Sequence, residues 1–383
     1  MIMLCLRCTL GGAEKRYARV FEMLVSQSKT EHKLLINREL LSLLQRAGIL
    51  VEHNESLIII ESRRHPVWKI LTKVPLLPKV LTILQYVWHC EQALREHRPT
   101  VVHPLLAGTL FSLPALIRHP HVRHVMSAYT SYTLPFASSI DKKVLGLNLR
   151  SVVRRWAMQH SDAIDALSTS IAEKLADHGI DRQKITVAPN SFTDISQCQP
   201  DSDKKRWVVF SGRLIESKQP NLLIQAAPQV LDEIPDVNFF VLGRGYLKAQ
   251  LEADISRLDL SDEVTLRFVP QPTQILNQSS IFVSLQIREN YPSQSLLEAM
   301  ACSNAIIATD VGETWRLVDE ENGLRIPATK EALASAIVDL FKDPQLYQKQ
   351  QASRQRVLSK HTPERFFAHI TRVYQQAVRG REN

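Results

Sequence analysis

Short apolar runs alternate with amphipathic segments along the first half of the chain. The apolar runs have the length of buried strands, and the segments between them carry apolar residues three and four positions apart, which predicts helices. The predicted strands are 2–6, 33–36, 57–60, 100–103, 124–127, 163–167 and 184–188. Predicted helices include 13–26 and 168–178. Strands that alternate with helices indicate a parallel sheet with helices on both faces.

The pattern pauses after Pro189 and then begins again. The second series predicts strands at 207–210, 238–242, 264–268, 281–285, 305–308 and 324–326. It predicts helices at 220–233, 246–258, 294–302 and 329–342, and a helical tail over 344–379. We therefore expect an α/β protein with two doubly wound, Rossmann-like domains that face each other across a cleft. Ligands of such sheets bind outside the carboxyl ends of the strands.

The expected boundaries follow from the same pattern. An N-terminal domain covers 1–190, a polar linker covers 191–205, and a C-terminal domain covers 206–360. The last segment, 361–383, is expected to be a helix that packs back toward the N-terminal domain. A chain of 383 residues agrees with two domains of ordinary size.

The charge is distributed unevenly. The net charge is +8, of which residues 1–195 carry +9 and residues 196–383 carry −1. A basic half suits a phosphorylated substrate, an anionic membrane or nucleic acid, and a solvated basic surface is the alternative. Five scattered cysteines fit a reducing compartment. We expect no secretory signal and no transmembrane helix, and therefore a cytoplasmic protein.

Two cations follow the strand 207–210. Arg213 and Lys218 lie on one loop, directly before a helix that Pro220 opens. Arginine can bind phosphate oxygens in a bidentate manner, and lysine adds a point charge. The pair therefore suits a diphosphate, and the alternative is two solvated surface cations.

A second cluster follows the strand 281–285. Ser293 is placed at the start of a helix, and the amide groups of such a first turn attract phosphate. Glu298 lies about one turn into this helix and could accept hydrogen bonds from a ribose diol. The alternative is a glutamate that stabilises the helix dipole. The glycines at 11–12 and at 243 and 245 also follow strands, where small residues let the backbone approach a phosphate or a sugar, although a tight turn is the more common reason for them.

These pieces, in this order, resemble glycosyltransferase family 4, the retaining nucleotide-sugar transferases of GT-B fold, also described as glycosyl transferases group 1. The matching segments are 11–14, 189–190, 211–213 with Lys218, 241–245, 289–302 and 306–313. The resemblance covers most of the chain and is specific over 205–327. It implies an acceptor-side N-terminal domain and a nucleotide-sugar-binding C-terminal domain.

The resemblance also implies roles for single residues. Arg213 and Lys218 would neutralise the donor diphosphate, and Glu298 would hold the nucleotide ribose. The first acidic position, filled by Glu289 or Asn290, would contact the transferred sugar. The remaining donor contacts would come from Gly11, Gly12, the backbone of Ser295, Leu296 and Leu297, and Val269 beside the base.

The sequence departs from the family pattern at several positions. The two glutamates are usually separated by seven residues, whereas eight separate Glu289 from Glu298, so either the loop is longer or Asn290 replaces the acid. Gln219 and Ser303 stand where glycine is common. The histidine that often follows the strand ending near Ser127 is absent. Low-ranking acceptor-side candidates are Tyr129 in that stretch and His103 at the end of another strand.

The expected function is transfer of a sugar from a UDP- or GDP-linked donor to a glycan or a lipid-linked acceptor, in surface polysaccharide, lipopolysaccharide or glycolipid synthesis. No metal or other cofactor is expected, because the nucleotide sugar is a substrate, and no nucleic-acid partner is expected. A basic segment with tryptophans, 63–88, could bring the protein to an anionic membrane surface. The alternatives are a GT-B-fold UDP-sugar epimerase and a catalytically degenerate donor-binding or scaffold subunit.

Overall fold

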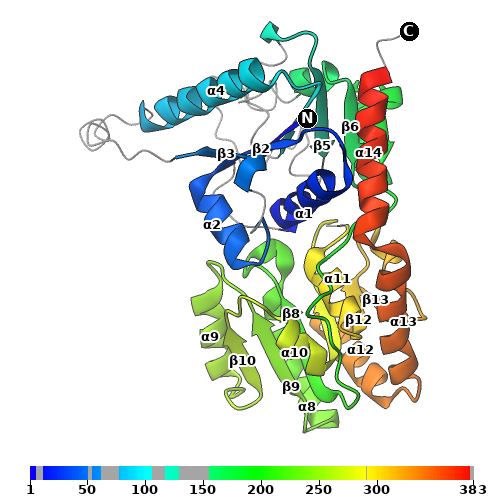
Figure 1. The fold of residues 1–383 in the computed structure, drawn as a ribbon. Coiled ribbons are helices and arrows are strands. Elements are labelled where there is room, and N and C mark those ends of the chain that lie inside the picture. The colour runs from blue at the N-terminus through cyan, green and yellow to red at the C-terminus, as the bar shows by residue number, and fades with distance from the viewer. Residues whose placement is uncertain are drawn as a thin grey trace. The chain divides into compact units, whose positions relative to one another are not determined.

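The computed structural model describes residues 1–5, 12–50, 54–61, 77–105, 117–128, 155–289 and 291–379. The chain forms two compact units, which are treated separately below (Figure 1). The first unit contains Met1–Pro189 and Phe366–Asn383, and the second contains Asn190–Arg365. Each unit is built on one parallel sheet with helices packed against it.

The first unit contains a seven-stranded sheet in the order β3-β2-β1-β4-β5-β6-β7. The strand order reverses between β1 and β4, which is the doubly wound arrangement. The strands are β1 (Ile2–Cys5), β2 (Lys33–Asn37), β3 (Leu57–Ile60), β4 (Val101–Leu105), β5 (Arg123–Ala128), β6 (Ala163–Ala166) and β7 (Ile185–Val187).

Within its described residues, the α-helices of this unit are α1 (Gly12–Gln27), α2 (Arg38–Arg46), α4 (Leu77–His97), α7 (Thr169–Asp177) and α14 (Pro363–Arg379). Helix α2 lies in a segment between two predicted strands and follows β2 without a loop. Asn37 ends the strand and caps the helix, because its side chain accepts a hydrogen bond of 2.7 Å from the Leu40 amide. The C-terminal helix α14, red in Figure 1, lies beside β6 and buries an apolar stripe that includes Phe366, Ile370 and Val373.

The second unit contains a six-stranded sheet in the order β10-β9-β8-β11-β12-β13. Its order reverses between β8 and β11, so the carboxyl ends of these two strands flank a switch point. The strands are β8 (Lys205–Ser211), β9 (Asn238–Leu242), β10 (Val264–Arg267), β11 (Ser279–Ser284), β12 (Ala305–Thr309) and β13 (Gly323–Ile326).

Successive residues of these strands point into two different apolar layers. Val208, Phe239 and Ile281 pack with one set of helices, whereas Val209, Phe240 and Phe282 pack on the opposite face. This alternation is the two-residue period of a strand, and it produces a three-layer structure. The helices are α8 (Pro220–Glu233), α9 (Lys248–Arg257), α10 (Thr273–Gln278), α11 (Gln294–Ala301), α12 (Lys330–Lys342) and α13 (Leu346–Lys360).

The predicted strands are confirmed in both units with end points that differ by one or two residues. The tail predicted as helical is two helices, α13 and α14, separated at His361 and Thr362. Pro363 has no amide hydrogen and suits the first turn of a new helix. None of the helices in the described ranges is long and apolar enough to cross a membrane.

Helix α11 ends in a left-handed residue that is not glycine. Ser303 has φ +55°. Its amide donates to Met300 O at 3.0 Å, and the Asn304 amide donates to Ala299 O at 3.1 Å. This is a Schellman motif, in which glycine is the usual residue at the left-handed position. The Ser303 hydroxyl is buried and makes no hydrogen bond to the described residues.

We expect Ser303→Gly to stabilise the protein by about 1 kcal/mol, since it removes a strained backbone conformation and a buried hydroxyl without a partner. Thermal unfolding measures this change. Ser303→Ala is the matched control because it removes the hydroxyl and keeps the Cβ atom. If glycine and alanine raise the melting temperature equally, backbone strain at this position is not the cause.

Candidate active site

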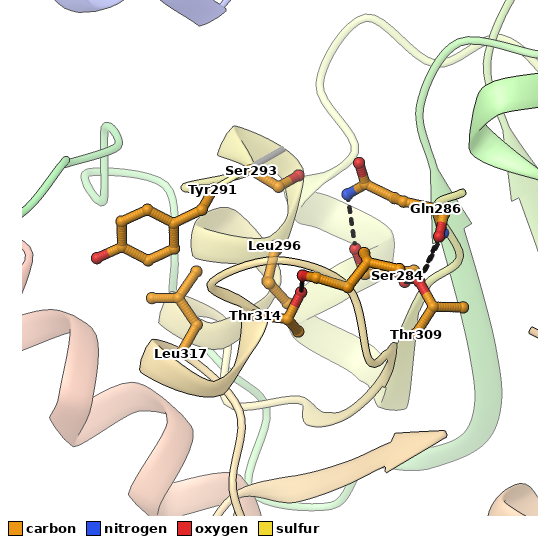
Figure 2. A pocket seen from close by; sticks show the side chains of 9 residues that line it. Ser284, Gln286, Tyr291, Ser293, Leu296, Thr309, Thr314 and Leu317 are labelled. Atoms are coloured by element: carbon orange, nitrogen blue, oxygen red, sulfur yellow. Dashed lines mark hydrogen bonds between the residues drawn. The ribbon is translucent and has the colours of Figure 1, made fainter. Parts of the chain in front are cut away.

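The candidate site lies at the switch point of the second unit, beyond the carboxyl ends of β8 and β11. Two neighbouring pockets occupy this place and share Ser284 and Gln286. One is also lined by Gly212, Lys218 and Ser295. The other extends toward Tyr291, Ser293, Thr309, Thr314 and Leu317, as Figure 2 shows.

The loop after β8 is held by the loop after β9. The Gly212 amide donates to Leu242 O at 2.9 Å, and the Leu214 amide donates to Arg244 O at 2.9 Å. A Cβ atom at Gly243 would lie 1.9 Å from Gly212 O, so only glycine permits this approach. The glycines after β9 therefore act on the site indirectly, by fixing the loop that carries Arg213.

Lys218 lines one of the two pockets. It ends the short 3₁₀ helix η5 (Glu216–Lys218), and its Nζ atom donates to Gln286 Oε1 at 2.8 Å. Burial, together with the smaller effect of the positive charge of Arg213, lowers the pKa of Lys218 to about 7. An anion at this place would relieve both effects.

Arg213 is exposed at the start of the same loop. Its charge acts on the Lys218 ammonium, which shows that the two cations lie near each other. The sequence prediction that these residues form one cationic group is therefore supported by the structure. Gln219, which follows Lys218, has φ +45° and caps the start of α8, where glycine would be less strained.

The amino end of α11 supplies amide donors next to Lys218. Ser293 is the N-cap residue, but its side chain makes no capping hydrogen bond. The first amide bonded inside the helix is that of Leu297, which donates to Ser293 O at 3.1 Å. Leu297 is therefore not a free donor, and the amides of Gln294, Ser295 and Leu296 are the first-turn donors available to an anion.

Glu298 and Val269 lie on the same unit. Glu298 is partly buried, and its Oε1 atom accepts a hydrogen bond of 3.4 Å from Thr193 Oγ1. Val269 is partly buried against the apolar layer below α11. Beside it Arg244 stacks on the ring of exposed Phe268, with its guanidinium carbon 3.4 Å from the ring centroid.

Glu289 follows β11 and lies against the loop after β12. A Cβ atom at Gly312, which has φ +53°, would lie 2.5 Å from Glu289 Cγ. The Glu289 side chain therefore fills the space that glycine leaves. Three predicted site residues, Gly11, Tyr129 and Asn290, lie outside the described residues. Gly12 is the first residue of α1 in the first unit.

His103, an acceptor-side candidate from the sequence, lies on β4 of the first unit. It is completely buried in the first unit, and burial lowers the pKa of its imidazole to about 4. Its Nδ1 atom lies 3.0 Å from Tyr374 Oη, and its Nε2 atom lies 2.7 Å from Ser127 Oγ. Both ring nitrogens are engaged inside the core, so the structure favours a structural role for His103 over contact with an acceptor.

The same network contains a buried acid–histidine pair. Asp165 Oδ2 accepts a hydrogen bond from Ser127 Oγ at 3.0 Å, and Oδ1 lies 2.7 Å from His369 Nε2 on α14. Burial by itself would raise the pKa of Asp165, but the hydrogen bonds from His369 and Tyr17 outweigh it and lower the pKa. This pair attaches α14 to the sheet of the first unit.

The sequence reasoning missed Ser284, Gln286 and Thr309, which line the pocket. Gln286 N donates to Thr309 Oγ1 at 2.8 Å, and Gln286 Nε2 donates to Ser284 Oγ at 3.1 Å (Figure 2). The available signal was their position, since each is a polar residue at the carboxyl end of an apolar strand of the second sheet.

Comparison with known families agrees with this site. The family Glycosyltransferase Family 4 matches residues 45–193, and the family Glycosyl transferases group 1 matches residues 191–356. The second match contains the whole switch-point site. The chain therefore belongs to the group 1 and family 4 glycosyltransferases, and its fold is GT-B.

Individual relatives are distant. The GtfA subunit of a UDP-N-acetylglucosamine–peptide N-acetylglucosaminyltransferase of Streptococcus pneumoniae is 25% identical over 210 residues, which are 53% of this chain and 41% of that protein. An N-acetylgalactosaminyltransferase of Campylobacter jejuni that acts on N-acetylgalactosamine-N,N'-diacetylbacillosaminyl-diphospho-undecaprenol is 31% identical over 131 residues, 33% of this chain and 35% of that protein. The chain thus spans less than half the length of these curated relatives.

A solved structure shows the same fold over nearly the full length. Anabaena HepE in complex with UDP and glucose superposes with a TM-score of 0.73 and 16% identity, and the match covers 98% of each chain. At this identity the likeness establishes the fold and does not establish the substrate.

The Asp165–His369 pair gives a stability prediction. We expect Asp165→Asn to destabilise the protein by on the order of 3 kcal/mol at neutral pH, because the buried His369 ring loses the carboxylate that it contacts. The folded-state pKa of Asp165 lies below its unfolded value of about 3.9. Its stabilisation is therefore present above that value and is lost as the pH falls through the folded pKa.

Urea unfolding at pH 7 and at a pH below about 3.9 measures both effects. The exposed Asp177, on α7 of the same unit, provides the control Asp177→Asn. Equal stability of the Asp165 and Asp177 variants at pH 7 would contradict the role of the pair in attaching α14.

Proposed function

We propose that the protein is a retaining glycosyltransferase that moves a sugar from a UDP- or GDP-linked donor to a glycan or a lipid-linked acceptor. One observation carries this proposal. Lys218 and the first-turn residue Ser295 of α11 line the same pocket at the switch point. Membership of the glycosyltransferase families supports it. A diphosphate is the ligand whose charge and size suit a lysine, an arginine and a helix amino end.

The proposed chemistry follows from the leaving group. The departing nucleoside diphosphate gains negative charge in the transition state, and fixed cations and amide dipoles stabilise that charge more than they stabilise the ground state. Lys218 and Arg213 supply the cations, and the first turn of α11 supplies the amides. In a retaining reaction of this kind the acceptor attacks from the leaving-group side, and the departing phosphate oxygen takes its proton.

The remaining site residues have proposed roles in donor recognition. Glu298 would accept hydrogen bonds from the ribose, and Val269 would flank the base. Glu289 or Asn290 would contact the transferred sugar, and Gly11 with Gly12 would approach the donor from the first unit.

We further propose that the protein acts at the cytoplasmic side of a membrane in surface polysaccharide or glycolipid synthesis. One of the relatives named above acts on an undecaprenol-linked acceptor. The first half of the chain carries the excess positive charge, and α4 exposes Leu84 and Trp88 one turn apart, at 56% and 59% of their surface. A basic surface with exposed apolar side chains suits an anionic interface.

Lys218→Ala is expected to lower kcat/KM for the nucleotide sugar by on the order of 10²- to 10³-fold, as for loss of one preorganised charge-stabilising donor. A thermal-shift screen of UDP- and GDP-sugars first selects the donor, because binding to the native state raises its stability. Donor hydrolysis, with and without acceptor, then measures turnover.

Lys205→Ala is the control, since Lys205 is an exposed lysine at the amino end of β8, the strand that precedes the loop of Lys218. Unchanged turnover after Lys218→Ala would remove Lys218 from the mechanism. Nucleotide binding without any turnover in the wild type would favour a degenerate donor-binding or scaffold subunit, and interconversion of a UDP-sugar with its epimer would favour an epimerase.

The membrane proposal predicts that the protein sediments with anionic liposomes at low salt and is released at high salt. Trp88→Ala is expected to weaken this binding several-fold, because an inserted indole is lost. Tyr347→Ala is the matched control, since Tyr347 is equally exposed, at 61%, but lies in the second unit. If neither the wild type nor the variants sediment with the liposomes at low salt, the proposal is refuted.

A further inference from the structure

We propose that Gln286 is a positioning residue that fixes the Lys218 ammonium at the switch-point pocket. This inference rests on the proposed function, because Gln286 would act through Lys218, the cation proposed to bind the donor diphosphate. Gln286 is 8% exposed and lines both pockets, so its side chain forms part of the wall between them.

The chemistry of the two side chains determines how Gln286 is oriented. A lysine ammonium only donates hydrogen bonds, so it requires the carbonyl oxygen of the amide and excludes the NH₂ group. Lys218 Nζ lies 2.8 Å from Gln286 Oε1. The NH₂ group is then directed to Ser284 Oγ, at 3.1 Å, where it donates. Both ends of the amide are thus used, and a rotation of the amide would break both contacts.

The backbone of Gln286 is fixed by a second residue. Gln286 N donates to Thr309 Oγ1 at 2.8 Å, and Thr309 Oγ1 donates to Gln286 O at 2.8 Å (Figure 2). Thr309 is the last residue of β12 and is 1% exposed. The Lys218 ammonium is therefore connected through Gln286 to the end of a neighbouring strand and is not held by its own flexible stem alone.

The charge around Lys218 makes this support necessary. The charged group that acts on its ammonium, among the residues that the structure describes, is Arg213, and both are cations. Burial of the ammonium already disfavours its charged form. The neutral acceptor Gln286 stabilises that charged form without neutralising it, so the positive charge stays available for a phosphate.

The test compares two substitutions of Gln286 with opposite effects on the ammonium. Gln286→Leu removes the acceptor and should lower the pKa of Lys218 by about one unit, whereas Gln286→Glu adds a negative charge and should raise it by about one unit. The titration is followed by NMR in lysine-labelled protein, with Lys218→Arg used for assignment. This readout does not depend on turnover.

The pH dependence of donor turnover gives the functional readout. With the donor selected by the thermal-shift screen, the alkaline limb of kcat/KM should move to lower pH in Gln286→Leu and to higher pH in Gln286→Glu. Below both limbs, Gln286→Leu should reduce kcat/KM by roughly 10- to 100-fold, the range for loss of a hydrogen bond to a charged group. A residue with a merely structural role would lower activity without moving the limb.

The chain offers a matched control. Lys205 Nζ donates to Gln278 Oε1 at 2.8 Å, which is the same pair of side chains at the same distance, but at the amino ends of β8 and β11. Gln278→Leu is expected to leave the pH profile and the Lys218 titration unchanged.

If Gln286→Leu fails to fold, substitutions of Thr309, which holds the backbone of Gln286, test the same inference. Thr309→Val should shift the Lys218 titration, whereas Thr309→Ser, which keeps the hydroxyl, should not. Identical Lys218 titrations in the wild type, Gln286→Leu and Gln286→Glu would overturn the inference. A wild type that turns over no nucleotide sugar would instead overturn the proposed function, and the titration would still decide whether Gln286 positions Lys218.

Discussion

The site depends on one unfavourable arrangement, a lysine ammonium partly withdrawn from water beside a second cation. Burial and the charge of Arg213 both lower the pKa of Lys218. The fold sustains this arrangement because the ammonium has a fixed acceptor in Gln286, and because the loop that carries it is bonded to the loop after β9. A site of this kind is organised before its ligand arrives, which is the condition under which charges contribute most to a transition state.

The sequence predicted the strands well because both sheets are made of apolar runs whose length and spacing are diagnostic. It also selected Arg213 and Lys218 as candidates, since two cations after a strand are visible in the chain itself. Gln286 could not be found in this way. Its importance comes from the pairing of β8 with β11, which brings residue 286 to residue 218, and a glutamine after an apolar strand carries no local signature of that contact. The bounds of the short helix α2 were not predicted, because its capping residue is also the last residue of a strand.

The glycine positions show which departures from the family pattern the fold can accept. Gly243 and Gly245 remain where a Cβ atom would lie 1.9 Å and 2.0 Å from a backbone oxygen, a contact that no adjustment of one side chain can relieve. Gln219 and Ser303 replace glycine where the requirement is a positive φ, which costs a non-glycine residue about 1 kcal/mol. Glycine therefore stands where the space requires it, and other residues stand where the cost is a modest backbone strain.

The two units treat buried ionisable groups in opposite ways. In the first unit, the Asp165 carboxylate is matched by His369 and by hydroxyl donors, and His103 is neutral with both nitrogens engaged, so the network is complete within the core. In the second unit, the partner of the Lys218 ammonium within the described residues is a neutral amide, and its charge is left uncompensated at a pocket. A complete network stabilises a fold, whereas an uncompensated charge at the carboxyl ends of strands costs stability and is useful only to a ligand. This contrast distinguishes the Lys218 ammonium, whose charge is open to a ligand, from the His103 ring, whose two nitrogens are engaged inside the core.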